Sequence, residues 1–218
     1  MEPFRLCLAL GPVAVYLLLL GALNLFRRPF LVSGARDTAA LGLAVSGFVI
    51  IGPVELFFPD QAANHFGSFV WMLLLAFYYL CVVLIILTIR PRLVIYNISV
   101  DQLRPVVADL VDQLDADARW AGDSLSLPAF GVQLHLDPSL LMRNVSLVSA
   151  GATQNHLGWK RLETALADKL GEYEFGRNLA GLPILAVGLC LTCVVTFLIV
   201  RAPQDIAAEL FDMLWLGS

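Results

Sequence analysis

The chain has 218 residues, of which 59% are hydrophobic and only 15% are charged. A soluble domain has about 25% charged residues, so this composition indicates a chain with about half of its length in lipid. The formal net charge is −4, and the charged residues form no basic block. Nucleic acid is therefore excluded as the expected partner.

Four apolar runs divide the chain, and each has close to the ~20 residues that a helix needs to cross ~30 Å of hydrocarbon. They cover residues 4–26, 38–58, 69–89 and 182–200. The first run is read as a retained span, because the first five residues contain both Glu2 and Arg5 and so form no basic region of a signal peptide, and no small-residue cleavage site follows. We therefore predict an α-helical integral membrane protein with four transmembrane helices.

Arginines define the expected threading of these four spans. They follow the first and third runs, whereas residues 59–68, between the second and third runs, contain no Lys or Arg. By the positive-inside rule, the first loop and the segment after the third run are cytoplasmic, so both termini are external. The excess of arginine over lysine suggests a bacterial source and hence the inner membrane. The arginines concerned are Arg27, Arg28, Arg36, Arg90, Arg92 and Arg104.

The polar block at 90–181 is predicted to form a small cytoplasmic α+β domain. Residues 93–98 are β-branched and aromatic on both faces, which favours a central strand. A helix begins near Gln102, capped by Ser99 or Asp101, and a second covers 156–170. Alternating residues predict three strands at 124–127, 132–137 and 144–149, and 173–175 are a candidate last strand. This order suits two helices on one face of a mostly antiparallel sheet, with a ferredoxin-like plait as the nearest known arrangement.

The second face of the predicted sheet is polar. Gln133, His135 and Asp137 share it with Ser124 and Ser126, so it faces water or a hydrophilic partner. His135 and Asp137 at i, i+2 are also compatible with an acid–base pair or half of a metal site. Without a third ligand or a nucleophile nearby in the sequence, a solvated polar face is favoured. We assign no catalytic residue, no metal and no cofactor.

Two polar residues lie inside the apolar runs. Glu55 is the only acid well inside a run, which suggests an ion or proton site, but its nearness to Pro59 favours an interfacial role. Asn24 is expected to make an interhelical hydrogen bond or to lie at the interface. Small residues predict close helix packing, and for the formal C-x-x-C pair this is favoured over redox chemistry because the pair lies mid-run. The packing residues are Gly42, Ser46, Gly188, Cys190 and Cys193.

The tail at 201–218 contains one further candidate helix, at about 203–216. Asp205, Glu209 and Asp212 recur at i, i+4, i+7 and form an acidic stripe opposite apolar residues, with Trp215 on a flank. The segment is too short to span a bilayer. We expect it to lie along the outer membrane surface or against another subunit.

Three classes of function remain open. The first is a non-catalytic anchor, scaffold or assembly factor, whose spans contact other membrane-protein subunits and the bilayer and whose domain contacts a protein. The second is a component of an oligomeric transporter or channel, for which Glu55 and Asn24 are the available polar residues. The third is a membrane enzyme with a pocket that joins His135 and Asp137 to Asp123 or Arg143. The first is preferred, because the sequence contains little site chemistry.

Overall fold

A computed structural model describes residues 3–54, 69–139, 143–151, 154–174, 176, 178–179 and 181–214. Most of this part is helical, and it also contains a six-stranded antiparallel sheet. The chain divides into two compact units. The helical unit comprises Met1–Leu19, Ala39–Thr88 and Ile184–Ser218, and the sheet unit comprises Leu20–Thr38 and Ile89–Pro183.

Four helices of the described chain are long and apolar enough to cross a membrane, which confirms the prediction at that level. Length and composition alone carry this assignment to a membrane. The second helix starts four residues before the predicted run and ends in a short π-helical segment, η1 (Ile50–Val54), which contains Pro53. The helices are α1 (Pro3–Leu25), α2 (Gly34–Val49), α4 (Phe69–Thr88) and α7 (Gly181–Arg201).

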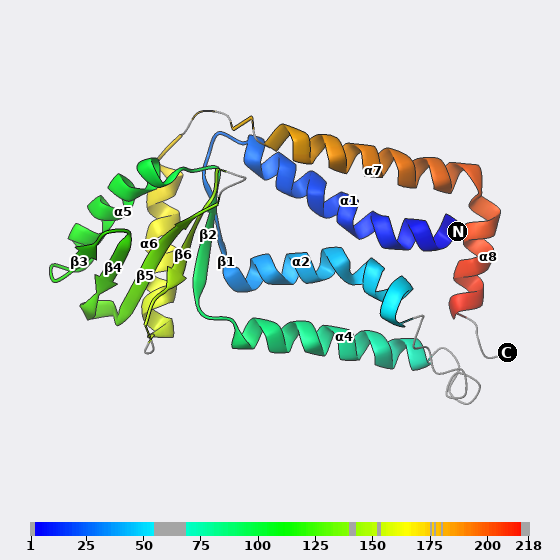
Figure 1. Ribbon diagram of the computed structural model, residues 1–218, viewed down its shortest axis with the longest axis horizontal. Coiled ribbons are helices and arrows are strands. Elements are labelled where there is room, and N and C mark those ends of the chain that lie inside the picture. Colours follow the sequence, from blue (N-terminus) through cyan, green and yellow to red (C-terminus); the bar gives the residue numbers. More distant parts are fainter. Residues whose placement is uncertain are drawn as a thin grey trace. The chain divides into compact units, whose positions relative to one another are not determined.

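Glycines bring these helices together in the order α7, α1, α2, α4 (Figure 1). A Cβ atom on Gly47 of α2 would overlap the carbonyl oxygen of Leu8 in α1. A Cβ on Gly188 of α7 would lie 2.9 Å from the backbone nitrogen of Leu18 in α1. Between α2 and α4, the Tyr78 hydroxyl donates a 2.6 Å hydrogen bond to the carbonyl of Gly42. Such backbone approach is what small residues permit in apolar helix pairs.

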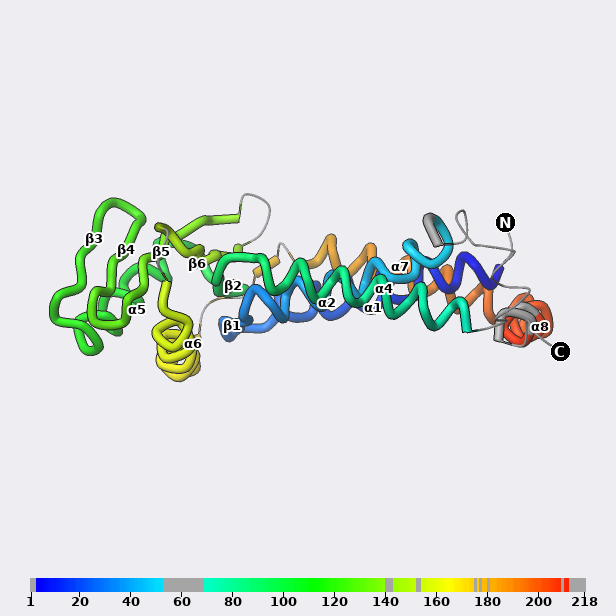
Figure 2. Tube along the Cα trace, turned by 90° about the horizontal axis from the view of Figure 1, so that it is seen from below, coloured from blue at the N-terminus to red at the C-terminus, as the bar shows by residue number. Residues whose placement is uncertain are grey.

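The sheet has the strand order β1-β2-β6-β5-β4-β3, and every neighbouring pair is antiparallel. Helices α5 (Val100–Leu114) and α6 (His156–Gly171) pack on one face, as Figure 2 shows for α6 beside β5 and β6. The core forms there because each helix turns a leucine- and valine-rich stripe onto the inward residues of the strands. The strands are β1 (Phe30–Ser33), β2 (Arg92–Tyr96), β3 (Arg119–Ala121), β4 (Ser124–Leu127), β5 (Val132–Pro138) and β6 (Val145–Ser149).

Two polar contacts hold the helices and their following loop. Asp115, only 5% exposed, accepts backbone hydrogen bonds from Asp117 at 3.0 Å and Ala129 at 2.9 Å, so it fixes the chain that follows α5. Lys169 of α6 lies 2.8 Å from a carboxylate oxygen of Asp109 in α5. The hydrogen bond from Lys169, and then its charge, lower the pKa of Asp109, and the same bond raises the pKa of Lys169.

Two features of the predicted domain are wrong. The sheet is not a ferredoxin-like plait, because that fold contains split βαβ units with parallel neighbours, whereas β3 to β6 here form a meander of antiparallel hairpins. Tyr173 and Glu174 form no strand, and Phe175 lies outside the described residues. The strands predicted at 93–98, 124–127, 132–137 and 144–149 correspond to β2, β4, β5 and β6.

The loop between α1 and α2 is part of the sheet. Its strand β1 pairs with β2 from Phe30↔Tyr96 to Ser33↔Leu93, and this makes β2 an interior strand. The sheet unit therefore includes residues 20–38 in addition to the block expected at 90–181. Strand β3, at the opposite edge, was not predicted either.

Candidate functional site

One face of the sheet is left uncovered over β4 and β5. On β5, Val132, Leu134 and Leu136 are at most 1% exposed beneath the helices, while the alternate side chains are exposed. Because α5 and α6 both pack on the buried side, a polar surface remains on the other side. We call it the open sheet face, and it consists of Ser124, Ser126, Gln133, His135 and Asp137.

A serine and a histidine meet on this face. Ser124 and His135 are opposite each other in the β4–β5 register, and the Ser124 Oγ lies 3.1 Å from His135 Nδ1. A nucleophilic serine needs a base that a third group orients in a water-poor site. His135 is exposed, and among the described residues no hydrogen bond links its ring to an acid. The contact is a cross-strand hydrogen bond of the surface.

Asp137 adds a carboxylate to the same face without completing a metal site. It lies two residues after His135 and opposite Ser146 of β6. The residues that the structure describes contain no group of three His, Cys, Asp or Glu side chains that could hold a metal ion. What this face offers chemically is a set of short hydrogen-bonding side chains on a regular strand spacing.

One end of the open sheet face is fixed by Gln154. Its amide nitrogen donates to the carbonyl of Gln133 at 3.1 Å, and its amide oxygen accepts from the backbone nitrogen of Gln133 at 3.3 Å. The indole nitrogen of Trp159, in α6, donates to the same amide oxygen at 2.9 Å. The beginning of β5 is thus held to the helix layer, so the surface is pre-organised.

The other end of this sheet face is closed by the first turn of α2. Tyr96 is 7% exposed, and its hydroxyl donates a 2.6 Å hydrogen bond to Asp37 Oδ1. Arg92 Nη2 lies 3.2 Å from Asp37 Oδ2, and its side chain crosses Gly34, where a Cβ would overlap it. We call Gly34, Asp37, Arg92 and Tyr96 the α2 junction. Asp37 and Tyr96 were not among the predicted site residues, and the local signal for Asp37 is its place as an acid in the first turn of a helix.

A second contact holds the end of α1. Asn97 is fully buried with φ of 64°, a left-handed conformation that asparagine tolerates better than most residues. Its side-chain nitrogen donates to the carbonyl of Phe26, just past the end of α1, and its backbone nitrogen donates to Asn144 Oδ1 at 3.1 Å. Carbonyls at helix ends lack intrahelical partners, so this contact satisfies one of them.

Asn24 is buried at 1% exposure, but its amide nitrogen donates to Leu20 of its own helix at 2.8 Å. A Cβ on Gly181 would lie 2.9 Å from Asn24 Cβ, so this side chain packs where α1 and α7 meet. The interhelical hydrogen bond expected for Asn24 is not among those of the described chain. Its Oδ1 has no partner within that same part.

The small residues of the spans separate into two groups. Gly42 and Gly188 lie at the helix contacts described above, and the Ser46 hydroxyl donates to the carbonyl of Leu43 at 2.8 Å within α2. Cys190 and Cys193 are exposed, so within this chain they do not belong to the α1–α7 contact that Gly188 makes.

The remaining candidates lie on the C-terminal helix or outside the described chain. Asp205 is exposed on α8 (Pro203–Leu214), which follows α7 after one residue. Glu209 and Asp212 are on the same helix, with side chains outside the described part, as are all of Glu55 and Trp215.

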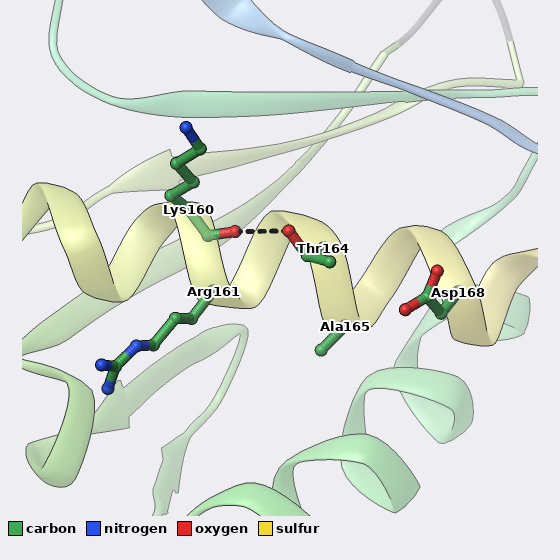
Figure 3. A pocket seen from close by; sticks show the side chains of 5 residues that line it. All are labelled: Lys160, Arg161, Thr164, Ala165 and Asp168. Atoms are coloured by element: carbon green, nitrogen blue, oxygen red, sulfur yellow. Dashed lines mark hydrogen bonds between the residues drawn. The ribbon is translucent and has the colours of Figure 1, made fainter.

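A shallow depression of about 360 Å³ lies on α6 (Figure 3). A ligand site normally gathers polar groups from several elements into a concave, mostly apolar cavity. Here every lining residue comes from one helix, and the Thr164 hydroxyl is already bonded to the carbonyl of Lys160 at 3.0 Å. The lining residues are Lys160, Arg161, Thr164, Ala165 and Asp168.

The open sheet face is thus the best candidate surface of the sheet unit. Comparisons with models of known protein families, with curated proteins and with solved structures find no match for this chain.

Proposed function

We propose that this chain is a non-catalytic, membrane-anchored subunit or scaffold of a larger membrane complex. Its α+β domain contacts a partner protein through the open sheet face. The observation that carries the proposal is that both helices cover one side of the sheet, which leaves five polar side chains of β4 and β5 uncovered. A regular, uncovered strand surface suits another protein better than a small molecule, which needs a concave cavity.

The proposal includes a threading in which the domain is cytoplasmic in a bacterial inner membrane and both termini are external. The β1–β2 pairing supports one element of this threading, namely that the first loop and the segment after α4 lie on the same side of the membrane. If α2 and α4 both cross the bilayer, residues 30–33 and 92–96 return to the same side, as their hydrogen bonds require. The arginine-rich segments then favour the cytoplasmic side.

Contacts with other membrane subunits are part of the same proposal. Tyr79 is 40% exposed near the middle of α4, and its ring lies 5.2 Å from that of Tyr78. A phenolic hydroxyl in hydrocarbon is unfavourable unless it finds a hydrogen-bond partner. This position supports a neighbouring helix from another chain beside α4.

The test compares two double variants of the full-length protein after mild detergent extraction. Gln133→Ala with His135→Ala changes the open sheet face, and Lys160→Ala with Thr164→Ala changes the outer surface of α6. Native mass spectrometry measures the fraction of chains that carry a partner. We expect the first pair to lower partner affinity at least about tenfold, as for truncated interface hot spots, while the second leaves it unchanged.

Two results would overturn the proposal. One is a wild-type chain that leaves the membrane as a free monomer in every mild detergent tried. The other is a partner that stays bound equally well to both double variants, which would place the contact away from the open sheet face.

A further inference from the structure

Positive charge is concentrated in one part of the sheet unit. Five arginines lie beside the ends of α1, α2 and α4 in the chain, and among the described residues two acids pair with them: Glu174 and Asp37. This group has an excess of three positive charges in a chain whose formal net charge is −4. We call it the arginine edge, and it consists of Arg27, Arg28, Arg36, Arg90 and Arg92.

The β1–β2 register distributes the arginine edge along one short strand. Ser33 is opposite Leu93, and the Arg92 side chain crosses Gly34 to reach the first turn of α2. Arg36, in that turn, and Arg90, two residues before Arg92, therefore belong to the same end of β1. Arg27 precedes the opposite end of β1, and the two ends are about 10 Å apart for a strand of this length.

Three of these arginines have no protein partner within the described chain. Arg28 is 2.9 Å from Glu174, and Arg92 is 3.2 Å from Asp37. Arg27, Arg36 and Arg90 are exposed, and in the described residues their guanidinium groups make no hydrogen bond or ion pair. A guanidinium group matches a phosphate with two parallel hydrogen bonds, so each can bind one phosphate group.

The position of these arginines next to the ends of the apolar helices indicates that the phosphate belongs to a lipid headgroup. Arg27 comes two residues after the end of α1, Arg36 is the third residue of α2, and Arg90 comes two residues after α4. These are the ends of helices that have the length and composition of spans. Side chains at such positions reach the headgroup layer of a bilayer.

We propose that the arginine edge binds the headgroups of anionic phospholipids, with Arg27, Arg36 and Arg90 as the phosphate-binding residues. Arg28 and Arg92 are paired with Glu174 and Asp37, so the net positive charge of the edge comes from the other three arginines. This inference is independent of the protein partner proposed above, because it concerns arginines next to the helix ends in the chain and not the open sheet face.

Native mass spectrometry of the purified full-length protein tests the proposal. Phosphatidylglycerol and phosphatidylcholine with identical acyl chains are titrated separately, and the lipids retained per chain are counted. The test variant carries Arg27→Gln, Arg36→Gln and Arg90→Gln. The control variant carries Arg119→Gln, Lys160→Gln and Arg161→Gln, which removes the same charge from β3, at the far edge of the sheet, and from the first turns of α6.

The wild type is expected to retain phosphatidylglycerol in preference to phosphatidylcholine, and added salt is expected to weaken that retention. Each arginine near an anionic surface contributes about fivefold to binding, so the loss of three should weaken phosphatidylglycerol binding about a hundredfold. The control variant should bind like the wild type.

Equal retention of the two lipids by the wild type would overturn the proposal. So would salt-independent binding, or an equal loss in the test and control variants. Competition by inorganic phosphate at the concentration of the lipid would show a free-anion site and would also refute the assignment to lipid. The wild-type salt and headgroup comparisons decide the question even if the triple variant fails to fold.

Discussion

Replacement of Tyr96 by phenylalanine tests whether the α2 junction holds β1 to the sheet. The substitution removes only the hydroxyl that donates a 2.6 Å hydrogen bond to Asp37. A hydrogen bond to a charged group contributes about 1.5–3 kcal/mol. Because 22% of the Asp37 side chain is exposed, water can compensate in part, so we expect the lower end, about 1.5 kcal/mol.

The measurement is hydrogen exchange of the peptide covering 26–38 in the full-length protein. Local opening controls exchange of such amides, so a loss of about 1.5 kcal/mol makes exchange about tenfold faster. Ser126→Ala, on the open sheet face, is the matched control and should leave this peptide unchanged. In an Asp37→Ala background, Tyr96→Phe should lose the part of its effect that comes from the hydrogen bond to Asp37.

Unchanged exchange in Tyr96→Phe would refute the reasoning, because the hydroxyl would then contribute nothing to the closure of β1. An equal acceleration in the presence and absence of the Asp37 carboxylate would also refute it. That result would assign the effect of Tyr96 to a contact other than Asp37.

Three further predictions concern packing, a buried carboxylate and pH. Gly47→Ala must separate α1 from α2 and should lower the free energy of unfolding in detergent by about 1–3 kcal/mol. Gly11→Ala, whose added Cβ would have no atom within 4 Å, should leave it unchanged. Thermal unfolding compares the two variants. Asp115→Ala leaves two backbone amides unpaired and should destabilise β3 to β5 by about 3 kcal/mol, as measured by hydrogen exchange against exposed Asp112→Ala. Carbon NMR should give the Asp109 carboxyl a pKa below its ordinary 3.8. In Lys169→Gln this pKa should rise. The stability from this pair is present above pH 3.8 and is lost as pH falls through the lowered value; for Lys169 it is present below 10.5 and is lost as pH rises through the raised value.

The local sequence pattern was sufficient to predict the elements that bury one of their own faces. The stripe of Leu103, Val107 and Leu110 identified α5, and the alternation of Val132, Leu134 and Leu136 identified both β5 and its exposed face. These patterns exist because burial on one side is repeated at the period of the element itself. The polar side chains of the open sheet face followed from the same alternation.

Pairing between distant segments could not be predicted in this way. Residues 30–33 look like the end of a loop between two spans, and only their partner, β2, makes them a strand. Residues 119–121 are too short to show alternation. The prediction of a ferredoxin-like plait was wrong for a related reason. The order of helices and strands is compatible with several strand pairings, and no local feature of β3 or β6 specifies which strand lies beside it.

Strand β1 also imposes an order on how the protein can be made. Phe30 leaves the ribosome about 66 residues before its partner Tyr96, and two apolar helices are synthesised between them. Through that interval the first loop has backbone groups without sheet partners, and Tyr96 cannot yet reach Asp37. Completion of the sheet is therefore a late step of biogenesis, and a soluble fragment that starts at residue 90 would expose the edge of β2 permanently and tend to aggregate.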